Sequence, residues 1–126
     1  MRIKDALQAT LAATPGIDLL SYDDLSSGLA LTACARGPCG REVLDRLAER
    51  AVDGFALVAG TPMPPGVEAG AFGSCLIRFG PGGAEIHARN PAAPDEAVSA
   101  ACAPGAPLLP SVRAALALAF RLAEGE

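Results

Sequence analysis

Hydrophobic residues near the start of the chain recur at four-residue steps. Ile3, Leu7 and Leu11 then share one face of a helix, which this pattern predicts over Ile3–Ala13. A Pro-Gly pair ends the helix, and the hydrophobic stretch that follows it predicts a short strand over Ile17–Tyr22. The chain therefore begins with a helix followed by a strand.

A polar turn joins this strand to the next one. Asp23 and Asp24 are followed by two serines and a glycine, and Asp and Ser side chains readily bond to nearby backbone groups in turns. The second strand is predicted over Gly28–Ala35, where hydrophobic residues occupy alternate positions. The two strands are expected to form a hairpin.

A second helical pattern is predicted from about Gly40 to Val52, with charged residues on the sides that the apolar stripe leaves. Gly54 favours an end to this helix, after which Phe55–Ala59 is predicted as a strand. The alternative is that the helix continues to Val58, because Phe55 still fits its apolar stripe. We favour the strand. The Pro-rich stretch Gly60–Gly70 is predicted to be a loop.

Alternation with a period of two is clearest around the Gly-Pro-Gly-Gly turn at 80–83. The flanking strands are predicted over Ser74–Phe79 and Ala84–Arg89. Their register places Arg78 opposite Glu85, an attractive cross-strand pair. On the other face, the same register pairs Phe79 with Ala84, Ile77 with Ile86, and Cys75 with Ala88.

The last third of the chain gives weaker patterns. The segment Asp95–Cys102 suits either a short helix or an edge strand, and the Pro-rich stretch after it is irregular. A final helical pattern follows Ser111, whose hydroxyl makes it a good N-cap for a terminal helix.

These elements predict an α+β fold in one domain covering residues 1–126. The domain is expected to have two layers, a mainly antiparallel sheet of about five strands packed against helices, in the order α-β-β-α-β-β-β-α. Hydrophobic residues make up 51% of the chain, but 27 residues are Ala and aromatic residues are only 4%. Small side chains bury little area each, so this core is expected to gain from a partner that covers an exposed face.

The overall charge excludes some partner classes. The net charge is −4, without a basic run interleaved with aromatic residues, which argues against nucleic-acid binding. No apolar run reaches the roughly 20 residues of a membrane span, and the first residues lack the apolar stretch of a signal peptide. A cytoplasmic location is expected, in which the four cysteines are free thiols.

Two of the cysteines, Cys34 and Cys39, lie close together in the sequence. They suggest a metal half-site or a redox couple, but no second pair of ligands has zinc-like spacing, so neither a metal nor a cofactor is expected. Cys39 lies beside a predicted helix start and near Arg36 and Arg41, an environment that stabilises a thiolate. Cys39 is therefore the candidate reactive thiol. The favoured interpretation, however, is an incidental cysteine at a helix start.

His87 is the only histidine and was considered as a lone general base. On the outer face of a predicted strand, a solvated or interface histidine is the favoured interpretation. The Asp23-Asp24 pair suits a turn better than a cation site. Known catalytic motifs are missing from the sequence, so no catalytic residue is assigned and an enzyme is not favoured.

Two stretches resemble the roadblock/dynein-light-chain (LC7) family. The first is Ala13-Thr14-Pro15-Gly16-Ile17-Asp18-Leu19-Leu20 followed by Gly28-Leu29-Ala30-Leu31, and the second is Pro104-Gly105-Ala106-Pro107-Leu108-Leu109 before the last helix. The element order is similar over most of the chain. The Pro-rich stretch Thr61–Gly66 and the segment Val98–Pro110 depart from the family pattern and leave the end of the sheet open.

The resemblance implies a five-stranded antiparallel sheet with helices packed against it. It also implies homodimers, with paired helices and edge strands, that act as docking or regulatory partners of small GTPases. No catalytic residues come with it.

The first functional hypothesis is therefore a homodimeric interaction module that binds a protein partner such as a small Ras-like GTPase. Its candidate surface is the charged side of the second helix: Arg41, Asp45, Arg46, Glu49 and Arg50. An ordinary solvated helix face is the alternative for these residues. The other hypotheses are a small-molecule-binding or thiol-dependent protein that uses Cys39 with Cys34, and a dimer similar to a secretion chaperone.

Overall fold

The computed structural model describes residues 2–60, 65 and 75–125 of the chain. The predicted order of helices and strands is confirmed. The elements are α1 (Ile3–Ala13), β1 (Ile17–Asp24), β2 (Leu29–Ala35), α2 (Arg41–Ala59), β3 (Cys75–Gly80), β4 (Gly83–Asn90), β5 (Ala93–Cys102) and α3 (Leu108–Ala123). None of the helices in these described ranges is long and apolar enough to cross a membrane.

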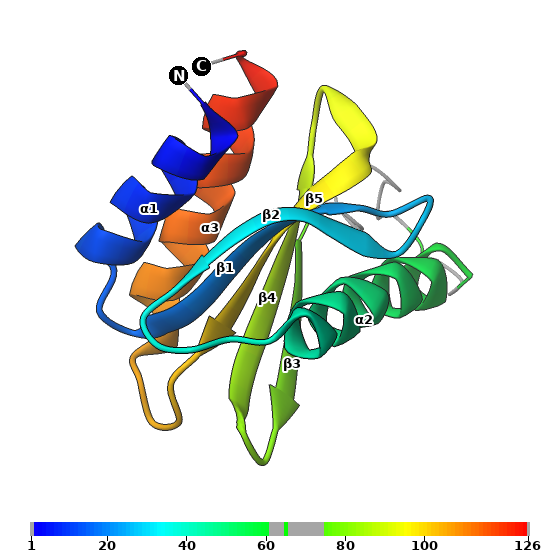
Figure 1. Cartoon of the computed structure of the whole chain (residues 1–126). Coiled ribbons are helices and arrows are strands. Elements are labelled where there is room, and N and C mark those ends of the chain that lie inside the picture. Colours follow the sequence, from blue (N-terminus) through cyan, green and yellow to red (C-terminus); the bar gives the residue numbers. More distant parts are fainter. Residues whose placement is uncertain (1, 61–64, 66–74, 126) are drawn as a thin grey trace.

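The strands form one five-stranded sheet in the order β2-β1-β5-β4-β3. All neighbouring strands are antiparallel, which confirms the predicted sheet. Helices α1 and α3 lie side by side on one face of the sheet, and α2 crosses the other face (Figure 1). The domain therefore has three layers, one more than predicted, because the sheet carries helices on both faces.

The larger hydrophobic core lies between the sheet and the α1–α3 pair. Its large members are fully buried: Leu7, Ile17, Leu20, Ile86, Val98 and Leu118. Alanines of both helices and of β4 and β5 fill the rest of this core, and their small side chains allow the helices to approach the sheet closely. A second, smaller cluster of Ala51, Phe55 and Ala97 lies beneath α2.

The hairpin of β3 and β4 has the predicted register. Arg78 pairs with Glu85 and Ile77 with Ile86, and the pairing extends to Gly80 and Gly83, which leaves a two-residue turn. Ser74, predicted to begin the first strand, lies outside the described residues. So does most of the predicted loop Gly60–Gly70, of which the structure describes positions 60 and 65.

The strand predicted over Phe55–Ala59 is wrong, because α2 continues to Ala59. Phe55 extends the apolar stripe of the helix and is 3% exposed. Gly54 acts inside the helix rather than ending it. A Cβ atom at this position would lie 2.7 Å from Cδ1 of Leu76, so the glycine allows β3 to approach the helix.

The ambiguous segment Asp95–Cys102 belongs to β5, which lies between β1 and β4 and is neither a helix nor an edge strand. Its alternate residues Val98 and Ala100 are buried against α1 and α3, whereas Ala97 and Ser99 are buried beneath α2. Burial on both faces removes the polar–apolar alternation that identifies a strand with one exposed face.

The prediction of Ser111 as an N-cap is also wrong, because α3 begins earlier, at Leu108. Pro110 lies in the first turn, where a missing N–H group costs no hydrogen bond because these groups have no acceptor within the helix. Ser111 is instead fully buried, and a Cβ atom at Gly16 would lie 3.2 Å from its hydroxyl oxygen.

Candidate functional site

The sheet face beneath α2 is polar along its three central strands. Ser21 and Asp23 lie on this face from β1, Ser99 from β5, and Glu85 and His87 from β4. Alternate residues of a strand point to opposite faces, so the hydrophobic positions between them face α1 and α3. Four of the five polar residues are fully buried, and the fifth, Glu85, exposes 19% of its side chain.

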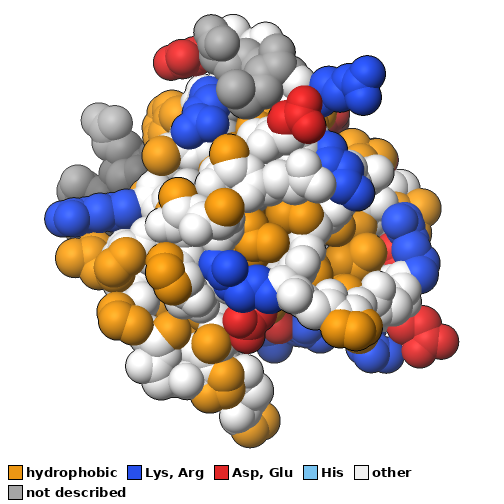
Figure 2. Space-filling view, turned by 60° about the vertical axis from the view of Figure 1, so that its left-hand side comes forward, with side chains coloured by type: hydrophobic (Ala, Val, Ile, Leu, Met, Phe, Trp, Pro, Cys, Tyr) orange, Lys and Arg blue, Asp and Glu red, His pale blue; other side chains and the backbone are white. Residues whose placement is uncertain are grey.

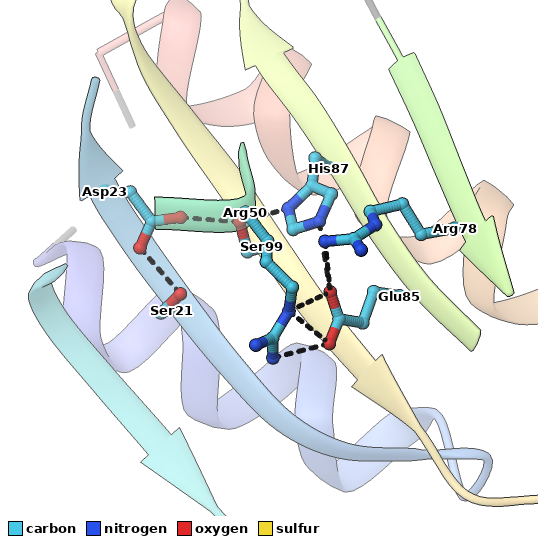
Figure 3. A network of polar contacts seen from close by, with 7 residues as sticks. All are labelled: Ser21, Asp23, Arg50, Arg78, Glu85, His87 and Ser99. Atoms are coloured by element: carbon cyan, nitrogen blue, oxygen red, sulfur yellow. Dashed lines mark hydrogen bonds and ion pairs between the residues drawn. The ribbon is translucent and has the colours of Figure 1, made fainter. Parts of the chain in front are cut away.

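These side chains form a continuous chain of contacts (Figure 3). The Ser21 hydroxyl donates to Oδ1 of Asp23 at 2.7 Å, and the Ser99 hydroxyl donates to Oδ2 at 2.5 Å. Nδ1 of His87 lies 2.7 Å from the Ser99 oxygen. Across the imidazole ring, Nε2 lies 3.5 Å from Oε1 of Glu85. The chain thus links β1 to β4 through β5.

Arg50 connects this chain to α2. Its Nε donates to both carboxylate oxygens of Glu85, at 2.8 and 2.9 Å, and its Nη2 lies 2.6 Å from Oε2. Arg78 of β3 approaches the same carboxylate at 3.9 Å (Figure 3). Burial alone would raise the pKa of Glu85, but His87 and Arg50 together outweigh it and lower the pKa to about 2. An ionised Glu85 therefore anchors α2 to the sheet.

Asp23 lies at the opposite end of the chain and has the opposite electrostatic character. Burial raises the pKa of its carboxyl group, although hydrogen bonds from Ser99 and Ser21 and the nearby His87 partly offset that effect. The environment therefore shifts the pKa values of the two carboxyl groups in opposite directions, lowering that of Glu85 and raising that of Asp23.

The residue types of a serine-hydrolase triad are present here, but their arrangement excludes that chemistry. In a triad the histidine lies between the serine and the acid and removes the serine proton. Here Ser99 lies between Asp23 and His87, so the acid contacts the serine and not the imidazole ring. The hydroxyl is also fully buried, so it presents no nucleophile to a substrate. The network is a structural and electrostatic feature of the α2 layer.

The sequence analysis missed this network. The expectation of a solvated or interface His87 is wrong, since α2 covers the side chain and leaves it 0% exposed. Asp24 does form the predicted turn, accepting hydrogen bonds from the backbone and hydroxyl of Ser26, but Asp23 points into the network. Polar residues at alternate positions of several strands were the available signal, but the sequence analysis assigns Asp23 to a turn and His87 to an outer strand face.

Cys34 and Cys39 line one cavity of about 350 Å³ at the β2 edge, together with Lys4 and Gln8 of α1. Cys39 is exposed, whereas Cys34 is half-buried and burial raises the pKa of its thiol. The structure thus places both candidate thiols near one another, and their reactivity stays a prediction. Within the described residues, no three His, Cys, Asp or Glu side chains are grouped as metal ligands.

The candidate charged surface on α2 divides into two parts. Arg41 pairs with Asp45 at 3.2 Å, and Arg46 lies 4.0 Å from Glu42 on the exposed side of the helix. Glu49 is also exposed. Arg50 instead turns toward the sheet and binds Glu85. The role of this surface in binding stays a prediction.

A groove of about 420 Å³ runs between the C-terminal half of α2 and β3. Apolar side chains of Leu57, Val58, Leu76 and Ile77 line it, with Arg50 and Arg78 among its polar residues. The edge strand carries further apolar surface: Phe79 is 77% exposed and Ile77 is 40% exposed. In the view that brings α1 and α3 forward, hydrophobic side chains are also spread between charged ones over the surface (Figure 2).

Comparison with models of known protein families finds no match. Comparison with curated protein sequences finds none either. Solved structures do match, and they confirm the fold that the resemblance predicted.

Two of them are roadblock/LC7 domains from Streptomyces avermitilis. One has a TM-score of 0.69 and 14% identity, covering 96% of this chain and 98% of that chain. The other has a TM-score of 0.70 and 12% identity, covering 97% and 95%. The gliding protein MglB from Thermus thermophilus is similar with a TM-score of 0.63 and 19% identity, covering 98% and 90%. A structure of MglB described as a tetrameric arrangement has the same TM-score and 21% identity, covering 98% and 89%.

Proposed function

We propose that this chain, which has the roadblock/LC7 fold, is a non-enzymatic module that forms a homodimer and docks a protein partner. The observation that carries the proposal is the apolar surface of β3, where Phe79 and Ile77 are exposed at the edge of the sheet. A large apolar side chain that is mostly solvated on an edge strand favours association, because burial of that surface is favourable. The partner class we propose is a small Ras-like GTPase, in keeping with the family resemblance.

The occupant we assign to the β3 edge is the β3 strand of a second copy. β3 is paired with β4 on one side only, so backbone groups along its other side lack a strand partner within the described sheet. Two such strands pairing antiparallel about a twofold axis would satisfy those groups and bring the two apolar surfaces together. One MglB structure is described as tetrameric, which is consistent with self-association in a chain of this fold.

The opposite edge of the sheet is less suited to this pairing. Helices α1 and α2 both pack against β2. Arg41 of α2 also donates a hydrogen bond to the carbonyl of Ala30 at 2.8 Å, which occupies a backbone acceptor of that strand. Leu31 of β2 is nevertheless 55% exposed, so it offers a control for an apolar edge residue that lies outside the proposed interface.

The exposed charges of α2 support the docking of a partner. The exposed Glu42–Arg46 pair is held within the helix, and pairs of this kind contribute only about 0.3–0.5 kcal/mol each. Such weak pairs exchange for contacts with a partner at little cost. Their mixed signs favour a partner surface of mixed charge over a polyanion.

Sedimentation at micromolar concentration tests the homodimer. We expect wild-type protein and a Leu31→Asp variant to sediment as dimers, and a Phe79→Asp variant to sediment as a folded monomer with unchanged circular dichroism. A wild-type protein that remains monomeric over the whole concentration range would overturn the dimer. Pull-down with small GTPases in GDP- and GTP-bound forms tests the partner class, with an Arg46→Glu, Glu49→Lys variant expected to weaken capture.

A further inference from the structure

The buried network leaves one polar atom without a hydrogen-bond partner. Nε2 of His87 is fully buried, and among the described residues it has no partner within hydrogen-bond distance. Its nearest charged neighbour is Oε1 of Glu85 at 3.5 Å. Buried nitrogen atoms in native proteins are almost always hydrogen-bonded, so this atom calls for a physical explanation.

The number of protons in the hydrogen-bond network supplies this explanation. A hydroxyl has a single proton, so Ser99 donates at one of its two contacts and accepts at the other. When it donates to an ionised Asp23, Nδ1 of His87 carries the proton that faces the Ser99 oxygen. If the ring carries no other proton, Nε2 turns a lone pair toward the Glu85 carboxylate, which is unfavourable in a buried site. One additional proton in the network removes this conflict.

That proton can occupy either of two positions in the network. It can lie on Nε2 of His87 while Asp23 is ionised. It can also lie on Asp23, which then donates to Ser99; Ser99 donates to Nδ1, and a neutral ring carries its proton on Nε2. In both arrangements an N–H group faces Glu85, so the proton belongs to the chain as a whole rather than to one residue.

We propose that the network Asp23–Ser99–His87 holds one shared proton that helps to fasten α2 to the sheet through Glu85 and Arg50, and that losing this proton loosens α2. With the proton present, Glu85 is held by Nε2–H and by Arg50. Without it, the lone pair on Nε2 repels the carboxylate to which Arg50 is bound.

The charged groups around the chain are consistent with this behaviour. On the α2 side of the sheet they are Asp23 from β1, Glu85 and Arg89 from β4, Arg78 from β3 and Arg50 from α2, while β2 contributes the uncharged Ala30, Ala33 and Ala35. The pKa of Asp23 is raised by its burial, so this carboxyl group favours keeping a proton.

Few contacts attach α2 to the sheet, so we expect this attachment to respond to the loss of the shared proton. Its buried apolar residues are few, namely Leu47, Ala48, Ala51 and Phe55. Its polar contacts with the sheet are the Arg50–Glu85 pair, the hydrogen bond from Arg41 to the carbonyl of Ala30, and the guanidinium of Arg89 over the ring of Phe55 with 4.4 Å to the ring centroid. A helix that rests on a polar face with few apolar anchors is expected to open locally before the core of α1 and α3.

Release of α2 would also change the surface proposed for docking, and only that consequence rests on the proposed function. We call the contact of the shared proton with Glu85 and Arg50 the latch. The latch lies within one polypeptide chain. It is therefore tested by comparing the pH response of α2 between variants that differ only in the network, and in the Phe79→Asp background where the wild type dimerises.

Amide hydrogen exchange at about pH 6 and about pH 8.5, corrected for the chemical exchange rate, tests the latch. In the wild type we expect the opening of α2 to increase roughly tenfold at the higher pH, the equivalent of one pKa unit of differential proton binding, while α3 stays unchanged. An Asp23→Asn variant donates permanently from its amide to Ser99, so the pH effect on α2 should disappear. The adjacent Asp24→Asn variant should retain it.

An equal response of α2 in wild type and Asp23→Asn, or no response in either, would overturn the proposal. A second measurement needs no variant. The chain has one histidine, so the imidazole ¹⁵N spectrum reports His87 alone. We expect the ¹⁵N shift of Nε2 to change from protonated to unprotonated together with the opening of α2 in the same pH series. A protonation state of Nε2 that does not follow the opening of α2 refutes the shared proton.

Discussion

The α-carbon of Gly83 lies against the backbone carbonyl of Cys102, where β4 leaves the hairpin turn beside the end of β5. A Cβ atom at position 83 would overlap that carbonyl oxygen, and the backbone φ of Gly83 is +116°. Both observations require glycine, since other residues are strained at this φ and the obstructing atom belongs to a backbone. We expect Gly83→Ala to lower the free energy of unfolding by about 2–4 kcal/mol, measured by urea titration.

The neighbouring Gly82 provides the control. It has no atom within 4 Å of a Cβ position and no positive φ, so Gly82→Ala is expected to change stability by less than about 0.5 kcal/mol. Equal losses for the two variants would contradict the steric role of position 83.

Arg36 fastens the end of α1 to the start of β1. Its Nε donates to the carbonyl of Ile17 at 2.7 Å, and its Nη2 donates to the carbonyls of Leu11 and Thr14. The cation lies at a helix C-terminus, where carbonyl groups lack partners and the helix dipole favours positive charge. We expect Arg36→Ala to destabilise the protein by about 1.5–3 kcal/mol, measured by thermal or urea unfolding.

An Arg36→Lys variant separates charge from geometry. Lysine keeps the positive charge, but its single ammonium group lacks the planar fork that reaches several carbonyls, so most of the loss should remain. Arg46, whose nearest acidic oxygen is 4.0 Å away, is the control, and Arg46→Ala is expected to be nearly neutral. Full rescue by lysine would show that the hydrogen bonds contribute little.

The parts of this fold that follow from local pattern were predictable. The β3–β4 register depends on alternation and on the opposite charges of Arg78 and Glu85, both within one hairpin, and the structure has that register. The length of α2 was not predictable in this way. Gly54 is a helix-ending signal in isolation, and its real role, close approach to Leu76, depends on a strand far along the chain.

The buried network was missed for a related physical reason. Whether His87 is solvated depends on what covers its strand face, and the covering helix α2 precedes β4 by many residues. A charged or polar residue on a strand is exposed in most sheets, and Asp23 also stands next to a true turn residue, Asp24. Only the assembly of β1, β4 and β5 under α2 brings the polar positions together.

The four cysteines are expected to differ in reactivity toward iodoacetamide. Cys39 is exposed, whereas burial raises the pKa of the thiols of Cys34, Cys75 and Cys102, which disfavours their reactive thiolates. We expect Cys39 to be alkylated at least about tenfold faster than the other three, by mass spectrometry of native protein.

The same measurement bears on the alternative thiol-dependent function. A Cys39 that reacts no faster than a free cysteine in an unstructured peptide removes the motivation for that function, whereas a strongly enhanced rate at neutral pH supports it. The buried Cys102 is the internal control, since rapid alkylation there would indicate that the protein has unfolded.

We expect acid to lower the folding stability of the protein by protonating Glu85. The pKa of its carboxyl group is about 2 in the folded protein, against an ordinary value of 4.5. A group with a lowered folded pKa stabilises the fold above its unfolded pKa, and that contribution is lost as pH falls from about 4.5 toward 2. At neutral pH the contribution is at most about 3.5 kcal/mol, because each pKa unit corresponds to about 1.4 kcal/mol.

A Glu85→Gln variant removes this titration. We expect it to be about 2–3 kcal/mol less stable than wild type at neutral pH, since it also leaves Arg50 without its carboxylate, and nearly equal to wild type at about pH 2.5. Urea titrations at several pH values measure the difference. Glu42, with 92% of its side chain exposed, is the matched control, and Glu42→Gln should follow the wild-type curve throughout. A constant gap between wild type and Glu85→Gln across the acid range would show that the Glu85 carboxylate does not anchor α2.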